Sequence, residues 1–354
     1  MEGEIKNLIK IWLTITASLC YCYFIPSRIP KGKYRLLSLL PIFSLFTILP
    51  LHLTYVFPTA IVAAAITWLA NFKLLLFSFD LGPLSSDPPK SFPLFITLAC
   101  LPTRITNQNH NHPFQNPKKP RKLALNLAIE VVFLAILMGF LHDYRERLQH
   151  GILLVLLLLY CLVVFLLVDI LFAVSNVVVW LGLEVEPPSN EPYLATSLQD
   201  FWGRRWNLTV TNTLRHTIHK PVWAATVGVL GRQWAQLAGV LSTFLVSGLM
   251  HELLLYYVTR GVSPTWEMTG FFVLHGVCVA VELGVKRAFP GRWRLHSAIL
   301  RPLTVGFVVA TSFWLFFPPL IRNNVDMRAI EEFKMFADFI KRKLNTSSMK
   351  LELN

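Results

Sequence analysis

Long apolar runs separated by short polar segments extend along most of this chain, and the pattern predicts helices that cross a membrane. The run at residues 151–179 carries a single charged side chain, Asp169. A bilayer offers no water to the backbone, so such a run is stable only as a helix, in which its own carbonyls satisfy the N–H groups. Further apolar runs lie at residues 8–24, 36–51, 60–79, 123–141, 234–258, 270–285 and 303–320. We therefore expect an all-α fold, a polytopic transmembrane helical bundle.

The span count depends on a short apolar run at residues 222–230. Arg232 and Gln233 separate it from the next run, which makes it a candidate half-helix. We expect about 8–9 spans, and the orientation of everything that follows depends on how this run is counted. The tail at residues 322–354 is charged but carries apolar residues at helical spacing, which is typical of a helix lying on a membrane surface. These are Ile330, Phe333, Phe336, Phe339 and Ile340.

We divide the single membrane-embedded domain, residues 1–354, into four parts. N-terminal spans occupy residues 1–182, C-terminal spans occupy residues 222–320, and a polar tail occupies residues 321–354. The segment between the two sets of spans, residues 183–221, is polar, aromatic and basic. An earlier polar stretch at residues 106–122 is rich in Asn and Pro and predicts an exposed loop.

Composition supports a protein that uses lipid as its solvent. Hydrophobic residues make up 54% of the chain and charged residues only 15%, whereas soluble domains carry about 25% charged residues. The net charge of +13 first suggests nucleic-acid binding. The basic residues, however, fall in short clusters between apolar runs, as in the cytoplasmic loops of membrane proteins. Such clusters could also attract a lipid headgroup or coenzyme phosphates. The five cysteines have no metal-ligand or redox spacing.

Two segments carry candidate chemistry. The first, at residues 198–207, gathers the aromatic and polar side chains Trp202, Arg204, Arg205, Trp206 and Asn207. Tryptophan and arginine are also common at membrane interfaces, so this segment alone decides nothing. The second segment places the pair His251 and Glu252 inside the apolar run at residues 237–258. Ionisable groups at membrane depth usually face a protein interior or a watery cavity. The alternative is a helix that ends near Met250 and leaves His251 at the interface.

Together the two segments resemble the membrane-bound O-acyltransferase superfamily, which pairs a histidine in an apolar helix with an upstream asparagine in a Trp-rich segment. Trp206-Asn207 precedes His219-Lys220-Pro221, and His251 follows Asn207 by 44 positions. The stretches at residues 190–207 and 68–77, the latter closed by Leu81-Gly82-Pro83-Leu84, are similar to plant wax synthases. This likeness covers nearly the whole chain.

The resemblance implies transfer of an acyl group from acyl-CoA to a lipid hydroxyl, inside an internal reaction chamber, without a cofactor. His251 is the expected general base, because a neutral imidazole can take the proton of an alcohol. Asn207 is expected either to donate to the developing oxyanion or to orient the acyl donor. We expect Trp202, Arg204, Arg205, Trp206, His216 and Lys220 to contact the substrates. The resemblance also implies the endoplasmic reticulum as the location.

Long-chain alcohol is the expected acceptor, which makes the product a wax ester. A sterol or a diacylglycerol is the rival acceptor within the same family. A transporter is the rival of another class, but we see neither internal repeats nor several intramembrane charges along a path. Glu252 is not expected to pair with His251, because adjacent residues on a helix point about 100° apart. His275 and Glu282 share the next apolar run, and we assign them no role, so replacement of His275 is expected to be mild.

Overall fold

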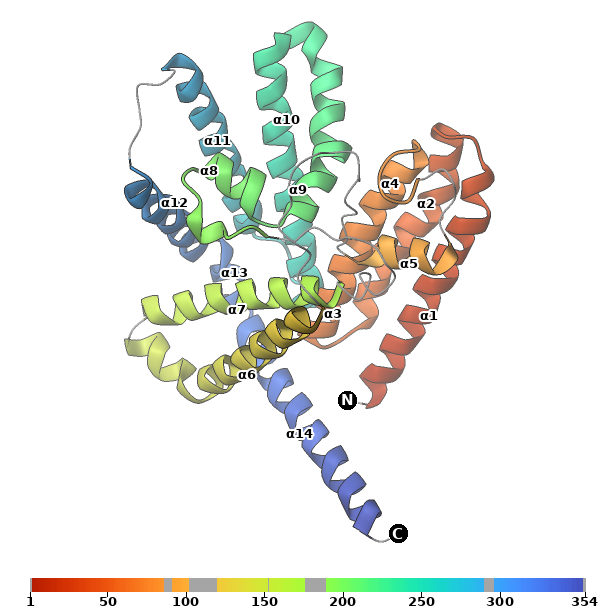
Figure 1. Cartoon of the computed structure of the whole chain (residues 1–354), viewed down its shortest axis with the longest axis vertical. Coiled ribbons are helices and arrows are strands. Elements are labelled where there is room, and N and C mark those ends of the chain that lie inside the picture. Colours follow the sequence, from red (N-terminus) through yellow and green to blue (C-terminus); the bar gives the residue numbers. More distant parts are fainter. Residues whose placement is uncertain are drawn as a thin grey trace.

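In the computed structural model, the described part of the chain consists of helices and the turns that join them (Figure 1). The structure describes residues 2–85, 91–101, 120–151, 153–175, 189–289 and 296–352. The loop expected at residues 106–122 lies almost wholly outside the described residues, as does the start of the polar segment at residues 183–188. No strand occurs in the described part of the chain, in agreement with the expected all-α fold.

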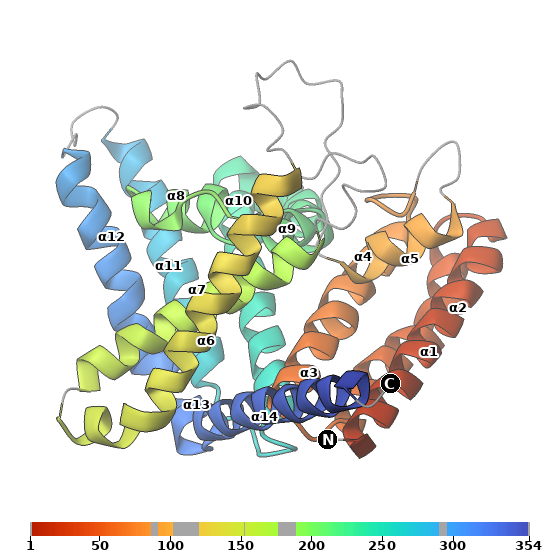
Figure 2. The same cartoon turned by 60° about the horizontal axis from the view of Figure 1, so that its bottom comes forward.

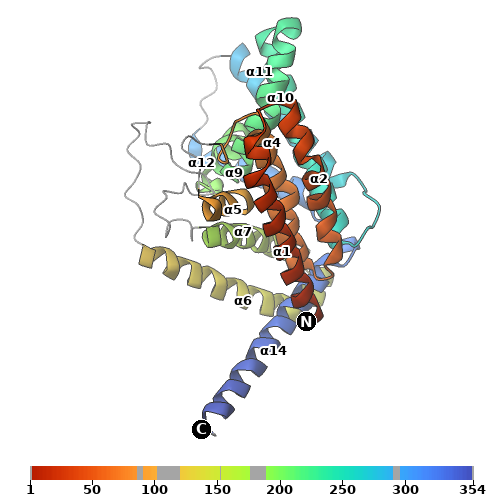
Figure 3. The ribbon, with the colours of Figure 1, turned by 90° about the vertical axis from the view of Figure 1, so that its right-hand side faces the viewer.

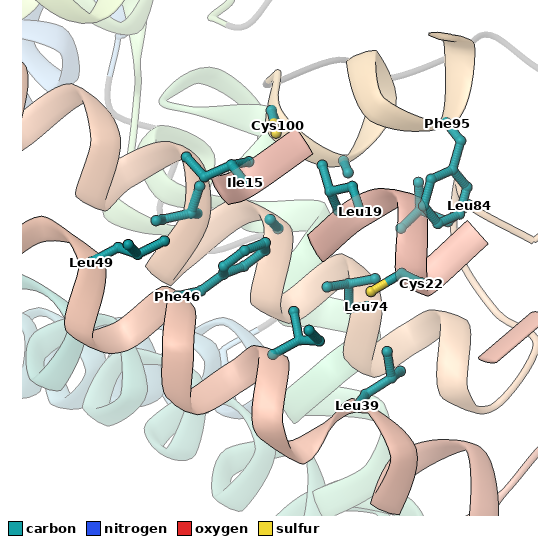
Figure 4. Close-up of a cluster of buried hydrophobic side chains, with 14 of the residues drawn as sticks. Ile15, Leu19, Cys22, Leu39, Phe46, Leu49, Leu74, Leu84, Phe95 and Cys100 are labelled. Carbon is teal, nitrogen blue, oxygen red and sulfur yellow. The ribbon is translucent and has the colours of Figure 1, made fainter. Parts of the chain in front are cut away.

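The N-terminal helices form one packed group, coloured red to orange in Figure 2. It comprises α1 (Glu2–Phe24), α2 (Lys33–Ile48), α3 (Val56–Val62), α4 (Asn71–Ser78) and α5 (Phe92–Cys100). A π-helical stretch, Ala63–Ala70, joins α3 to α4. Apolar side chains from these helices pack together in a hydrophobic core, drawn in Figure 4. Its members include Ile15, Leu19, Leu39, Phe46 and Leu74, all fully buried.

Carboxylates from both ends of the chain cover the start of α3. Glu4 of α1 accepts hydrogen bonds from the backbone N–H groups of Thr54 and Tyr55. Glu332 of α14 (Val325–Glu352) accepts from those of Val56 and Phe57 at 2.6 and 3.1 Å. The first N–H groups of a helix have no partner within the helix itself, so two acidic side chains suit this position.

In a second group of helices, α6 (Pro120–Gly151) and α7 (Leu153–Ser175) run across the view of Figure 1. Helices α6 and α7 pack against α13 (Pro318–Arg322) and the first half of α14. The tail is thus a helix, as expected; Ile330 is buried, whereas Phe336 and Ile340 are exposed. Figures 1 and 3 show the end of α14 extending away from the other helices.

The helices that carry the candidate chemistry form a third group. It contains α8 (Leu198–Asp200), α9 (Leu208–Leu214), α10 (Lys220–Val258), α11 (Glu267–Ala288) and α12 (Ser297–Thr311). The run α10 is two helical legs, because Gly231 has a φ of 75° and reverses the chain there (Figure 1). The short run at residues 222–230 belongs to the first leg.

Small residues let α10 and α11 approach closely. A Cβ atom built on Gly248 would lie 2.8 Å from the Cα of Thr269, and one on Gly276 would lie 2.8 Å from the Cβ of Phe244. Membrane helices often pack through such positions, where the missing side chain allows the two backbones to meet.

Among the described residues, seven helices are long and apolar enough to cross a membrane. The expected count of 8–9 is therefore not confirmed. One of the seven, Leu208–Val258, includes the reversal at Gly231. A shorter apolar helix, Leu158–Val168, comes from α7.

Candidate active site

His251 lies on the second leg of α10, and its hydrogen bonding fixes its tautomer. The Nδ1 atom is 2.7 Å from the carbonyl oxygen of Ser247, one helical turn earlier. A carbonyl oxygen can only accept, so Nδ1 carries the hydrogen in the neutral imidazole and Nε2 carries the lone pair. In the described part of the chain, Nε2 has no hydrogen-bond partner. Nε2 therefore keeps a lone pair that can accept a proton.

Aromatic rings from three elements surround the imidazole of His251. Its centroid is 4.9 Å from Trp68 in the π-helical stretch, 4.3 Å from Phe272 of α11 and 5.8 Å from Phe316, which follows α12. Trp68 belongs to the segment at residues 68–77 that the sequence singled out. The packing fixes the plane of the imidazole and gives it an apolar surrounding.

Glu252 turns away from His251. Its side chain is only 3% exposed, and its Oε1 accepts the backbone N–H of Thr269 at 3.1 Å, near the start of α11. The prediction that the two adjacent residues do not pair is confirmed. Glu252 caps the first turn of α11 and so links this helix to α10 beside the histidine.

Trp202 joins the Trp-rich segment to the surroundings of His251. It lies in the π-helical turn Phe201–Arg205. Its ring packs 5.7 Å from Phe272, on which the ring of His251 also packs. Its indole Nε1 donates to Nδ1 of His275 at 2.9 Å. One phenyl ring thus stands between Trp202 and His251.

Asn207 begins α9 in a left-handed conformation, with a φ of 41°. Asparagine tolerates this conformation better than most residues. Its Oδ1 accepts the backbone N–H of Val210 at 3.2 Å, which makes Asn207 the N-cap of α9. The side-chain NH2 has no hydrogen-bond partner among the described residues and remains able to donate. No hydrogen bond in this part of the chain joins Asn207 to His251.

The contacts of Arg205 and Trp206 hold their own segment together. Arg205 pairs with Asp200 at 2.7 Å and donates to the carbonyl oxygens of Asn190 and Glu191. Trp206 stacks on Phe201, with 10° between the ring planes. These bonds fix the turn that leads to Asn207. Whether the two side chains also contact substrate stays a prediction.

Three further predicted substrate contacts, Arg204, His216 and Lys220, are exposed. His216 and Lys220 lie one turn apart, and the ammonium of Lys220 donates to Nε2 of His216 at 3.1 Å. The Nδ1 of His216 lies 3.0 Å from the carbonyl oxygen of Asn212. Their accessibility is compatible with an anionic donor, and that role also stays a prediction.

Two cavities border this region. One, of about 110 Å³, lies between α6, α7, α13 and α14. Its lining is apolar except for Tyr160 and Asp326, and the hydroxyl of Tyr160 donates to the carboxylate of Asp326 at 2.6 Å. A smaller one lies between Trp68 and the face of α10 that carries Met250 and Leu254. Neither of these two cavities is lined by His251 or Asn207.

Comparison with known proteins shows which proteins this chain resembles. Residues 185–274 match the model of the membrane bound O-acyl transferase family. A long-chain-alcohol O-fatty-acyltransferase of Simmondsia chinensis is 43% identical over 97% of this chain and 98% of its own. Arabidopsis thaliana has a protein named "Probable long-chain-alcohol O-fatty-acyltransferase 3", which is 45% identical over 97% of this chain and 98% of its own. Acyl-CoA–sterol O-acyltransferase 1 of the same plant is 39% identical over 96% and 98%.

This chain belongs to the membrane bound O-acyl transferase family. The predicted resemblance to that family and to its plant wax synthases is confirmed, and so are the multi-pass membrane fold and the acyltransferase class. The family match at residues 185–274 contains both Asn207 and His251. The roles of individual residues remain predictions.

Sequence reasoning missed two features of this membrane bound O-acyl transferase. It gave no role to His275, which is fully buried and hydrogen-bonded through both ring nitrogens. It also did not find Phe272 and Phe316, which pack on His251. A histidine within an apolar run was a usable signal for His275, the same one that identified His251. The phenylalanines are indistinguishable in sequence from ordinary residues of an apolar helix.

Proposed function

We propose that this acyltransferase esterifies a long-chain alcohol with a fatty acyl group from acyl-CoA and so produces a wax ester. Relatives named for this reaction match nearly the full length of the chain. The observation that carries the chemistry is the Nδ1–H tautomer of His251, which leaves Nε2 unprotonated within an aromatic surrounding.

In the proposed reaction, Nε2 of His251 removes the hydroxyl proton as the alcohol oxygen attacks the thioester carbonyl. A C–O bond forms, the carbonyl oxygen gains negative charge, and the C–S bond then breaks. The proton passes from His251 to the departing thiolate, so the imidazole ends neutral. The NH2 of Asn207 is our candidate donor to the developing oxyanion, because nothing else in the described chain occupies it.

We further propose that the cavity between α6, α7, α13 and α14 receives an alkyl chain. Twelve of its fourteen lining residues are apolar and suit methylene groups. One of them, Phe317, packs 5.6 Å from Phe316, which contacts His251. The anionic part of acyl-CoA would approach from the side that carries the exposed side chains of Arg204, His216 and Lys220. We infer the endoplasmic reticulum as the location, because both lipid substrates are made there.

A sterol is the second candidate acceptor, since a sterol O-acyltransferase is among the full-length relatives. The test is to express the chain in cells without neutral-lipid acyltransferases. Microsomes then receive labelled acyl-CoA with fatty alcohol, sterol and diacylglycerol in equal supply. We expect mainly labelled wax ester. If sterol ester or triacylglycerol is the main product, the proposal that the acceptor is a long-chain alcohol is wrong. If no labelled ester forms at normal protein level, the proposed acyltransferase activity is wrong.

A further inference from the structure

His275 lies fully buried on α11 and connects three elements. Its Nδ1 accepts the indole N–H of Trp202 at 2.9 Å, and its Nε2 lies 2.8 Å from the hydroxyl oxygen of Thr311, at the end of α12. The Thr311 hydroxyl in turn donates to the carbonyl of Phe307 at 2.8 Å. The Trp-rich turn is therefore tied to α11 and α12 through one side chain.

The donors fix the tautomer of His275 without ambiguity. An indole N–H can only donate, so Nδ1 must hold a lone pair, and the neutral ring carries its hydrogen on Nε2. Nε2 then donates to Thr311, whose own hydrogen goes to Phe307. His275 is thus the opposite tautomer of His251. Because both of its nitrogens are engaged, His275 has no lone pair left to act as a base.

The position of Trp202 bears directly on the candidate site. Its ring packs on Phe272, the ring that also contacts His251. Its carbonyl oxygen accepts the hydroxyl of Thr211 in α9 at 3.0 Å, which links the turn to the helix that Asn207 caps. A displaced indole would therefore disturb the ring packed against His251, and a turn that moved with it would also shift α9 through the Trp202 carbonyl.

We propose that His275 is a positioning residue for acyl transfer. It holds Trp202, and through it the turn that ends at Asn207, against the pair of helices that carries His251. This inference rests on the proposed function. The helix pair itself has separate support, because Gly276 of α11 packs on Phe244 of α10 and Glu252 caps the start of α11. Loss of the His275 hydrogen bonds should therefore release the indole while α10 and α11 stay packed.

Two near-isosteric variants separate the two hydrogen bonds. In His275→Asn, the amide oxygen occupies roughly the place of Nδ1 and can still accept from Trp202. In His275→Gln, the amide reaches the place of Nε2 and Thr311 but leaves the indole N–H without an acceptor. An unsatisfied buried donor costs the equivalent of about 5- to 150-fold in an equilibrium constant. We expect kcat to fall about 10- to 100-fold in His275→Gln and in Trp202→Phe, with less than about threefold change in His275→Asn.

The measurements are kcat and KM for acyl-CoA at matched protein level, using whichever acceptor the parent protein esterifies. The double variant His275→Gln/Trp202→Phe should have a kcat no lower than that of the less active single variant, because both substitutions remove the same hydrogen bond. Thr311→Val serves as the control for the other hydrogen bond and should keep Trp202 in place. Equal losses in His275→Asn and His275→Gln, or additive losses in the double variant, would overturn the positioning role.

A second readout does not depend on turnover. The fluorescence of Trp202 is obtained in each background, parent, His275→Gln or His275→Asn, by subtracting the spectrum of the same protein with Trp202→Phe. We expect this difference spectrum to change in the His275→Gln background and to be preserved in His275→Asn. If the parent protein forms no ester, the proposed function fails, and this spectrum alone tests whether His275 holds Trp202. Identical spectra in both backgrounds would contradict the proposal.

Discussion

The Nδ1 atom of His251 lies 2.7 Å from the carbonyl oxygen of Ser247, a bond that directs the lone pair of Nε2 away from its own helix. His251→Ala removes this base, and loss of a general base typically lowers the rate about 10²–10⁴-fold. We expect at least such a loss in specific activity, measured in microsomes with protein quantified by immunoblot. His52→Ala is a suitable control, because His52 is exposed. An enzyme with His251→Ala and normal turnover would falsify the mechanism.

The two ends of the Asn207 amide can be tested separately, since its Oδ1 caps α9 and its NH2, which has no partner among the described residues, is the proposed oxyanion donor. Asn207→Asp keeps an acceptor for the cap and tolerates the left-handed backbone, but it loses the donor. We expect it to lower kcat about 10²–10³-fold, as removal of an oxyanion donor does, with little change in thermal stability. Asn207→Ala should lose both activity and, from the missing cap, about 1 kcal/mol of stability. Near-normal kcat in Asn207→Asp would exclude the donor role.

The contact between Gly248 and Thr269 is tight enough to be tested with a single methyl group. A Cβ at Gly248 would lie 2.8 Å from the Cα of Thr269, which is backbone and cannot move aside alone. Gly248→Ala should therefore separate α10 from α11 and lower the stability by about 1–3 kcal/mol. Thermal unfolding in detergent measures the change. Gly284→Ala on the same helix pair, where the Cβ would meet nothing within 4 Å, should be neutral. Equal melting temperatures for both variants would contradict the packing.

Chain-length preference should respond to the volume of the cavity between α6, α7, α13 and α14. Ala329 of α14 lines it, so Ala329→Leu reduces the space for an alkyl chain. We expect the spectrum of esters formed from mixed acyl-CoAs and mixed alcohols to shift towards shorter chains, as judged by mass spectrometry. Ala224→Leu, on the exposed face of α10, is the matched control. If both variants give the parent's product spectrum, the cavity does not hold substrate.

The sequence predicted much of the architecture, because membrane helices are specified locally. An apolar run must be helical in lipid whatever surrounds it, so the main spans could be found one by one. The turn after the run at residues 222–230 was visible as Arg232 and Gln233, but the reversal itself depends on the positive φ of Gly231. The amino-acid sequence near Gly231 does not show in which direction the chain continues after this glycine.

The site could be predicted only in part. His251 was identifiable because an ionisable group in an apolar run is costly. Its tautomer and the rings around it depend on Trp68, Phe272 and Phe316, which come from distant parts of the chain. For the same reason His275 escaped notice: its partner Trp202 is 73 positions away. The sequence also gave no sign that Arg205 pairs with Asp200, five positions earlier, and its predicted contact with substrate stays a prediction.

The two carboxylates at the start of α3 belong to segments that are synthesised at very different times. Glu4 is made first, whereas Glu332 follows all seven candidate spans. Until α14 docks, the N–H groups of Val56 and Phe57 lack their acceptor, and the helix that continues through Trp68 towards His251 is open at its start. The N–H groups at the start of this helix therefore gain their acceptor only after the candidate spans of the described chain have been made. A nascent chain halted before Glu332 would contain His251 and Asn207 and still lack the acceptor at the start of the helix that leads to Trp68.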